Sequence, residues 1–341
     1  KINVKKSDKP VLTQRPVLPA AFIGGVQYKV PAARFTDYNT DTPSVINAEV
    51  YYEDENGNER AISGEFTPNA AIHGAKTALK FVAVSSVTGG KTEARYEIPV
   101  VQAVGARESD GEYTYAFDKM FVTEGVAYSD LNENGATFYG SGEFGVTYAN
   151  LLRGDVEIRV KSARFYDNFE SMRFIVADAA DEHRKICAEV WKKDGEYSYV
   201  SVNGGDKILT EGSVSDYSKG FGFSFSRSSG KILNINGKSI AMAKTYEDGT
   251  AFCGFPSGYV KVTAEVNSPA SDSSISLYYL NGQNMSSLKT TDSIAPYIEL
   301  KNEIELQRAK NEKITIVAAN VFDVLDPNAK VTLNVSAPSG E

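Results

Sequence analysis

The chain has 341 residues, of which 42% are hydrophobic and 23% charged, a composition of ordinary globular domains and a length that suits two or three of them. Its 36 Lys and Arg against 44 Asp and Glu give a formal net charge of −8 at pH 7. That balance argues against nucleic acid as a partner, because affinity for phosphates depends on clustered basic residues. No apolar run reaches the ~20 residues of a spanning helix, so no membrane span is expected. The first residue is Lys1 with no signal-peptide pattern after it, and we expect a fragment of a longer protein.

Few residues of the kind that carry catalysis or bind metals are present. The two cysteines, Cys187 and Cys253, and the two histidines, His73 and His183, lie far apart in the sequence. This spacing provides no zinc motif, no Cys/His nucleophile cluster and no disulfide framework. A bond between the two cysteines across neighbouring strands and a pair of buried free thiols are both open, and both histidines are expected at the surface.

Short runs of alternating apolar and polar residues recur along the whole chain, separated by Gly, Asn, Asp and Ser. In chain order the clearest runs are 48–52, 156–160, 221–225 and 259–266. Helical periodicity is nearly lacking, and only 302–311 stays undecided. Dipeptides that tolerate the left-handed backbone of tight turns separate several runs, which favours antiparallel pairing. The chain is therefore predicted to be all-β and built of several β-sandwiches.

An internal repeat relates the two ends of the chain. Residues 28–37 (YKVPAARFTD) align with residues 314–323 (ITIVAANVFD) at an offset of 286, and the same offset pairs Pro10 with Pro296. Chance seldom preserves both the pattern and its spacing to a boundary proline. A module that starts near Asp8 is thus predicted to start again near the end of the chain.

The repeat divides the chain into three predicted parts. Residues 1–102 form an immunoglobulin-like sandwich of ~95 ordered residues, the usual size of that fold. Residues 290–341 are the first half of a second such module. Residues 103–289 are too many for one seven-stranded sandwich and too rich in strands for a linker, so they predict a larger two-sheet domain of jelly-roll type.

The patterns resemble known families. The run from Gly24 to Asp37, with 64–68 (GEFTP) and 98–100 (IPV), resembles the bacterial immunoglobulin-like repeats of Gram-positive surface proteins. The middle block is similar to the concanavalin A-like (laminin-G-like) sandwich found between such repeats, on the segments 135–138, 146–150, 174–178 and 252–255. The resemblances imply a large extracellular protein, often anchored in the cell wall, whose middle sandwich binds glycan or another surface ligand. They rest on framework positions and transfer no binding residue.

Two short motifs have chemical meanings in other proteins. Glu108, Asp110 and Glu112 match the E-x-D-x-E spacing that places acids on one strand face in laminarinase-like glycosidases. Here Ser and Gly separate them and Asp110-Gly111 is a turn dipeptide, which favours a solvated linker. Residues 140–145 match G-x-G-x-x-G, but a β-branched and aromatic segment follows instead of a helix, which favours a glycine-rich hairpin.

Oxygen-bearing side chains precede Gly135 at the spacing of positions 1, 3 and 5 of a calcium loop, namely Asp130, Asn132 and Asn134. Position 12 is Ser141 instead of Glu, and no helices flank the segment. A plain Asx-rich turn between strands is therefore favoured, with calcium as the alternative and the acids around Asp178 and Asp181 as a further candidate site. No other cofactor is expected.

Aromatic residues are the remaining candidates for ligand binding, because flat rings stack on sugar faces as well as filling cores. Around the turn at 194–195, strict alternation places Tyr197 and Tyr199 on one sheet face and Trp191 on the other. Neither face is plainly polar, which suggests central burial or a partly covered concave surface. Trp191, Tyr197 and Tyr199 are thus candidate ligand-binding residues, with packing as the alternative. The alternating phenylalanines of 221–225 are predicted to lie in the core.

These observations predict a non-catalytic fragment of a secreted or cell-surface bacterial protein, whose central sandwich binds carbohydrate or another surface ligand in adhesion. Its expected partner is a glycan or a host-surface ligand, and its expected neighbours are further domains of the same chain. Two alternatives stay open. The modules are a purely structural stalk, or they are accessory modules of an extracellular glycoside hydrolase.

Overall fold

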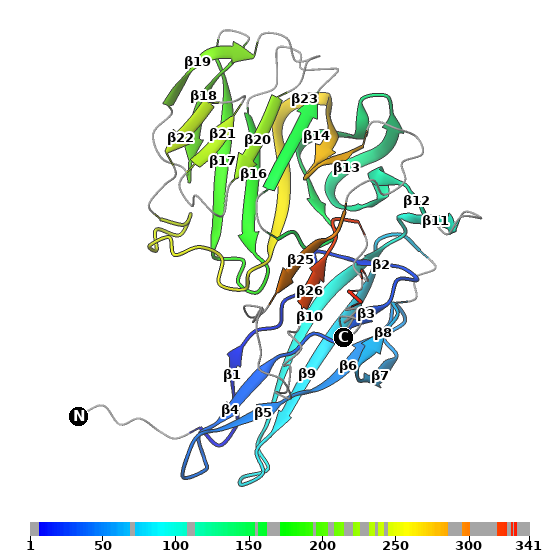
Figure 1. The fold of residues 1–341 in the computed structure, drawn as a ribbon, viewed down its shortest axis with the longest axis vertical. Helices are drawn as coiled ribbons and strands as arrows, with labels where there is room; N and C mark the ends of the chain where they lie inside the picture. The colour runs from blue at the N-terminus through cyan, green and yellow to red at the C-terminus, as the bar shows by residue number, and fades with distance from the viewer. Residues whose placement is uncertain are drawn as a thin grey trace, which may run out of the picture.

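A computed structural model shows an almost entirely β protein, which confirms the predicted fold class (Figure 1). The one helical segment among the described residues, η1 (Phe117–Lys119), is far too short to cross a membrane. The structure describes residues 7–68, 72–107, 113–153, 156–161, 171–193, 196–203, 208–214, 221–225, 232–235, 238–241, 245–285, 295–300, 319–325, 329 and 331–332. The E-x-D-x-E acids and the undecided stretch 302–311 lie outside these ranges.

The N-terminal part forms a sandwich around its own core. One layer has the order β1 (Val11–Gln14), β4 (Arg34–Asp37), β5 (Ser44–Asn47). The other has the order β2 (Phe22–Ile23), β10 (Lys91–Val101), β9 (Ala75–Val84), β6 (Glu49–Glu53), β7 (Glu59–Ile62), and a short ladder joins β3 (Tyr28–Lys29) to β8 (Glu65–Phe66). Phe35, Leu79, Phe81 and Val100 are fully buried between the layers. Period-two alternation thus supplies one apolar face per strand, as the sequence predicts.

A small ladder of β11 (Val104–Arg107) and β12 (Tyr113–Tyr115) leads into the central part, whose strands form one curled sheet. Three long strands run through both of its layers, β13 (Phe121–Asn132), β14 (Gly135–Tyr148) and β23 (Val260–Leu280). The first half of β23 pairs with β16 (Ser171–Asp178), which continues to β17 (Lys185–Lys193), β18 (Glu196–Val202) and β19 (Ile208–Val214). The second half pairs with β15 (Val156–Lys161), and the sheet order then runs through β20 (Phe221–Phe225), β21 (Ile232–Ile235) and β22 (Lys238–Ala241). The short strand β24 (Gln283–Asn284) pairs with the end of β23. The two halves therefore become the two layers of a sandwich.

The layers close on a common core. Phe174 of β16 and Phe223 of β20 stack with ring centroids 4.9 Å apart and 15° between their planes. Phe225 is also buried, so the prediction of a phenylalanine core in this strand is confirmed at Phe223 and Phe225. The side chain of Phe221 lies outside the described ones.

The glycine-rich run 140–145 lies where β14 passes from one layer to the other. The prediction of a hairpin is wrong here, because the run is a bulge within β14, between Gly140 and Gly142. Gly142 has φ of 72° and Gly125, on the neighbouring strand, has φ of 67°, which side chains rarely adopt. A Cβ on Gly140 would lie 2.7 Å from the Phe144 ring. The glycines therefore permit the bend that turns one sheet into two layers.

The N-terminal sandwich packs directly on the central one. The backbone N–H groups of Ala20 and Ala21 donate to the Ala149 carbonyl at 3.0 and 3.2 Å. Ile23 and Val101, at the ends of β2 and β10, are buried in the same cluster as the central core. The two parts thus meet through buried apolar contacts and main-chain hydrogen bonds.

The described C-terminal strands repeat the N-terminal pairing. β25 (Tyr297–Leu300) lies 286 residues after β1 and pairs with β26 (Ala319–Phe322) as β1 pairs with β4. Tyr297 opposes Phe322 and Ile298 opposes Val321, which are the equivalents of the pairs formed by Val11 and Leu12. The internal repeat in the sequence therefore corresponds to the same strands, in the same register at these two pairs; the irregularity of β1 between Leu12 and Gln14 has no counterpart in β25. The boundaries at 102/103 and 289/290 stay predictions.

Candidate functional site

The outer face of one central layer carries a row of charged residues. The register aligns Glu124 of β13, Gly145 of β14, Glu265 of β23, Arg173 of β16 and Glu189 of β17. Residues directly opposite one another in antiparallel strands share a face, so these five positions lie side by side across the sheet. Five strands at ~4.8 Å spacing make the row ~19 Å long. We call it the charged row.

The charged row forms the floor of a groove. A hollow of about 710 Å³ is lined by all five positions of the row and by Glu143 and Asn267. A second hollow of about 560 Å³ shares Glu265 with the first and reaches the N-terminal sandwich at Arg95 and Tyr96. We call the two hollows together the sheet groove, because both open on the same outer face.

Arg173 is the centre of the polar contacts in the groove. Its Nη1 donates to Glu265 Oε2 at 2.9 Å, its Nη2 to Glu247 Oε1 at 3.1 Å and its Nε to Cys187 Sγ at 3.3 Å. Burial alone would lower the pKa of Arg173, but the Cys187 sulfur and the two carboxylates reverse this and hold its pKa above the ordinary value. Lys185 Nζ adds a contact of 2.9 Å to Glu247 Oε2. The guanidinium is thus held in place by three elements.

The carboxylates of the row keep unused hydrogen-bonding capacity. Glu189 Oε1 accepts the Ser171 hydroxyl at 2.6 Å, and Glu265 accepts one guanidinium N–H at 2.9 Å. A carboxylate offers about four lone-pair sites, so each can accept further donors from a ligand. Glu124, Glu143, Glu189 and Glu265 against Arg173 make the lining of the larger hollow predominantly acidic.

The three predicted aromatic residues lie beside the charged row. Trp191 of β17 directly opposes Tyr199 of β18, one row further along the same face as Glu189. The prediction that Trp191 and Tyr199 occupy opposite faces is wrong, because a bulge between Trp191 and Lys192 shifts the register after the hairpin. Tyr197 opposes Lys192 beyond that bulge, and the side chains of Tyr197 and Tyr199 lie outside the described ones. A ligand-binding role of the three stays a prediction.

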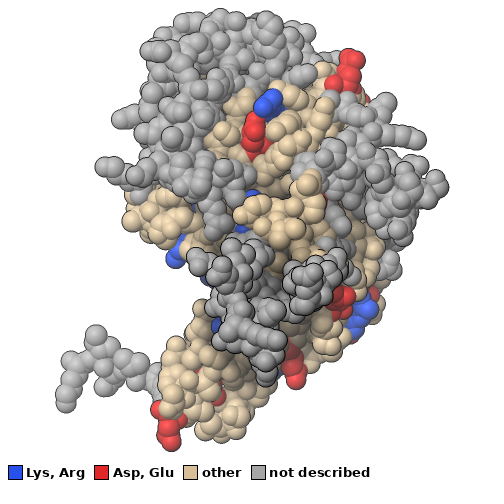
Figure 2. Space-filling model, in the orientation of Figure 1, with Lys and Arg blue, Asp and Glu red and all other residues tan. Residues whose placement is uncertain are grey.

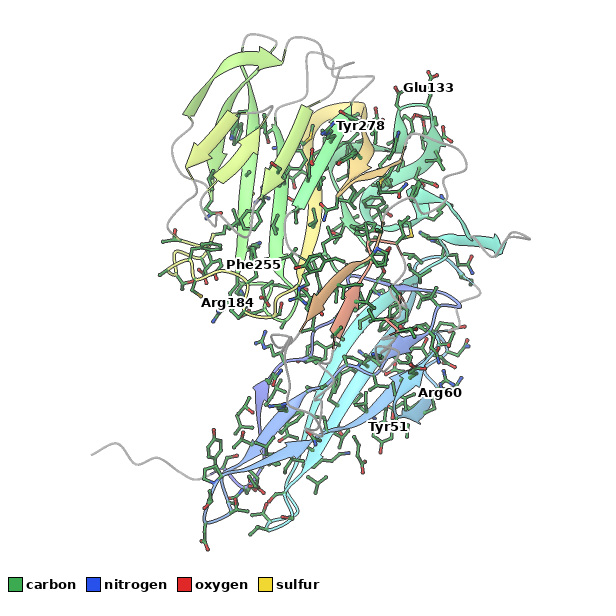
Figure 3. The ribbon with its side chains drawn as sticks, viewed as in Figure 1. Tyr51, Arg60, Glu133, Arg184, Phe255 and Tyr278 are labelled. Carbon is green, nitrogen blue, oxygen red and sulfur yellow. The ribbon has the colours of Figure 1, made fainter. Side chains whose placement is uncertain are left out.

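The other predicted residues have structural contacts. Asn132 Oδ1 accepts the Asn134 N–H at 2.9 Å, and Asp130 accepts the Asn132 amide at 3.4 Å, so these side chains form the Asx turn of the β13–β14 hairpin. Figure 3 shows Glu133 at the tip of that hairpin. The described residues include no group of three His, Cys, Asp or Glu able to hold a metal ion.

Asp178 is a buried structural residue, whereas the two histidines lie at the surface. Asp178 is buried, and its carboxylate accepts the N–H groups of Ala180 and Ser257, each at 2.9 Å. His73 and His183 are exposed, which confirms the prediction for both. Acidic and basic side chains are scattered over the described part of the face in Figure 2.

Both cysteines are free thiols in different surroundings. Burial raises the pKa of Cys187 to about 11, although the Arg173 guanidinium opposes the shift. Cys253 is exposed and lies 3.5 Å from an Arg184 nitrogen. The structure thus shows two free thiols, of which Cys187 is buried as the second alternative expects, whereas Cys253 is not.

Comparison with known proteins identifies no family for the chain. No family model matches the chain, and no curated protein matches it. A solved structure of the carbohydrate-binding modules from the β-sandwich superfamily, described as promiscuous in specificity, aligns over 81% of this chain and 98% of its own at 10% identity and a TM-score of 0.25. The secreted serine protease VesC from Vibrio cholerae aligns over 83% of this chain and 51% of its own, at 12% identity and a TM-score of 0.26. Neither likeness identifies a shared function.

The charged row was not predicted from the sequence. Its members are charges within largely apolar strands that hold other charged residues closer to their ends, Arg173 in SMRFIVAD, Glu189 in KICAEVWKK and Glu265 in VKVTAEV. A charge inside a largely apolar strand is a recognisable signal. That the three positions form one row depends on pairings between distant strands.

Proposed function

We propose that the central sandwich binds a neutral carbohydrate chain in the sheet groove. The observation that carries the proposal is the charged row, which places carboxylates and one fixed guanidinium side by side along an open groove. Ligand sites combine shape with a few placed polar groups, and sugar hydroxyls can donate to carboxylates and accept from a guanidinium. Trp191, on the same face, supplies a flat ring for stacking.

The charge of the larger hollow of the sheet groove favours neutral over anionic glycans. Four Glu against one Arg line the larger hollow, so a uronic or sulfated polymer brings like charges together. A neutral chain instead offers hydroxyl donors to carboxylates that still have acceptor capacity. Rejection of anionic polymers is therefore part of the proposal.

The proposed function is binding without catalysis. Binding needs only the groove and its polar groups, and the Arg173 guanidinium is fixed in ion pairs with Glu265 and Glu247. We further propose an extracellular, cell-surface or secreted location in a bacterium, on the resemblance of the sequence to immunoglobulin-like surface repeats. The repeated β1/β4 and β25/β26 pairing supports a protein of tandem modules.

Isosteric variants test the proposal. Glu189→Gln and Glu265→Gln keep shape but remove charge, and the double variant should weaken binding of a neutral polysaccharide by about tenfold or more, since charge-assisted hydrogen bonds contribute ~1.5–3 kcal/mol each. The matched control is Glu157→Gln, which breaks a similar pair with Arg159 at 2.9 Å, outside the residues lining the groove. Affinity electrophoresis against neutral and anionic polysaccharides measures the effect. Retention by none of them, or equal loss in the control, refutes the proposal.

A structural stalk is the second candidate, favoured by one observation. Main-chain hydrogen bonds from Ala20 and Ala21 to Ala149 join the N-terminal and central sandwiches directly. Such a junction suits a spacer, because it fixes the orientation of one sandwich relative to the next. The polysaccharide assay separates the two, because a spacer binds nothing in the sheet groove.

A further inference from the structure

The C-terminal segment docks on the central sandwich through one turn. The Tyr148 hydroxyl donates to the Val324 carbonyl at 2.6 Å, and Asn150 Nδ2 lies 3.3 Å from the carbonyl oxygens of both Val324 and Leu325. Val324 is 9% exposed and Leu325 0%, and both belong to the buried cluster of the central core. The turn that follows β26 is therefore part of a domain interface, which we call the turn dock.

The N-terminal module has the same turn in the equivalent place. Asp323 Oδ1 accepts the Leu325 N–H at 2.7 Å, and 286 residues earlier Asp37 Oδ1 accepts the Asn39 N–H at 2.9 Å. Both aspartates are buried; Asp37 is the last residue of β4, and Asp323 directly follows the equivalent strand β26. The two turns thus have the same cap and present their carbonyl groups in the same order.

The two turns differ in what covers them. Tyr38, the equivalent of Val324, is 44% exposed, although it is a large aromatic residue. Figure 1 shows β4 and β5, which flank this turn, in the part of the module away from the central sandwich. The turn dock uses main-chain carbonyl groups as acceptors, which both turns possess, and it also buries Val324 and Leu325, whose equivalents are Tyr38 and Asn39. A surface that is buried in one repeat is therefore exposed in the other.

We propose that the turn at residues 37–39 is a docking surface for a β-sandwich of the kind formed by residues 103–289, seated on its segment 148–150. The proposal does not depend on glycan binding. Tyr38 would take the buried place of Val324, and the carbonyl groups of residues 38 and 39 would accept from Tyr148 and Asn150 of the second sandwich. Tyrosine suits such a place, because it combines a large apolar area with a polar tip.

The chain's own turn blocks this contact between copies. Residues 323–325 are tethered to the sandwich on which they dock, and a tethered partner acts at an effective concentration in the ~mM range. The full chain should therefore stay monomeric. Weakening the internal turn dock should free the segment at 148–150 for the Tyr38 turn of another copy, and such head-to-tail contacts build rings or open chains of several copies.

Two variants of the full chain release the internal turn. Leu325→Asp places a charge in the apolar interface, and the milder Asp323→Ala removes only the cap of the turn. Sedimentation velocity should show a mass that rises with concentration for both variants and a monomer for the parent chain. Adding Tyr38→Asp should weaken this association about tenfold or more.

The controls make each outcome decisive. Circular dichroism and Trp191 fluorescence check that each variant is folded, and Asp323→Ala alone decides if Leu325→Asp unfolds. Tyr128→Asp, which changes another exposed tyrosine (59% exposed) on the central sandwich, should leave the association unchanged. Folded variants that stay monomeric at every concentration, or an association that survives Tyr38→Asp, overturn the proposal.

Discussion

Replacing Phe174 with Ala tests whether the two central layers share a core. The ring lies 4.9 Å from that of Phe223 on the opposite layer, and both side chains are 1% exposed. Removing a buried phenylalanine costs about 3–5 kcal/mol, because the lost contacts leave a cavity that the layers fill only in part. With a urea dependence of roughly 1–3 kcal/mol/M, the unfolding midpoint should fall by about 2 M.

Tryptophan fluorescence makes this measurement specific to the central sandwich. Trp191 is the one tryptophan of the chain and lies in β17, next to β16. The matched control is Phe81→Ala, a fully buried ring in the core of the N-terminal sandwich, which should lower the transition seen by circular dichroism and leave the Trp191 midpoint nearly unchanged. A shift below about 0.5 M for Phe174→Ala, at an unchanged slope, would refute the packing of the two layers at this point.

Two further predictions concern the thiols and the bend. A thiol reagent at about pH 8 should label Cys253 and spare Cys187, because burial raises the pKa of Cys187 to about 11. Mass spectrometry of the folded protein measures the labelling, and equal labelling of both cysteines would contradict this prediction. The pKa of Cys187 is higher in the folded than in the unfolded protein, so its contribution to the free energy of unfolding is complete below the ordinary thiol pKa and declines toward about pH 11. Urea midpoints of the parent protein should therefore fall over this pH range, and those of Cys187→Ser should lack this part of the fall. Gly125→Ala should cost about 1–3 kcal/mol, since φ is 67° and the new Cβ would meet the Glu143 carbonyl at 2.6 Å. Gly57→Ala, with φ of 80° but open space, should cost less, and equal losses would show that the close approach contributes nothing.

Local patterns in the sequence were enough to predict the strands and the repeat. Alternation in segments such as 48–52 and 221–225 indicates which side chains each strand buries. This prediction does not depend on which strand is the partner. The repeat at an offset of 286 residues was visible because the same sandwich positions need similar residues in both copies. Its confirmation in β25 and β26 therefore follows from local chemistry.

Pairings between distant strands could not be predicted in the same way. β23 pairs with β14, β15 and β16, and it changes partner halfway along its length. No local pattern states which strands become neighbours, because the choice depends on the whole core. The charged row depends on two such pairings, of β23 with β14 and with β16, which is why its members were seen as strand residues and not as a site.

The bulge after Trp191 shows how one residue decides the character of a face. Under strict alternation Trp191 shares its face with Ser198 and Val200, whereas the bulged register opposes it to Tyr199 and sets Val190 against Val200. The apolar pair Val190 and Val200 then belongs to the core side, and the aromatic position 199 joins Trp191 and the charged row on the outer side. A single extra residue thus separates an apolar layer from a polar and aromatic one, although the sequence reads as mixed on both sides. The charged row does not depend on the bulge, because the pairings that align Arg173, Glu189 and Glu265 do not include it. The outer face beside the row does depend on it: without the bulge Ser198 would stand opposite Trp191 where position 199 now stands, and Val200 would share that face.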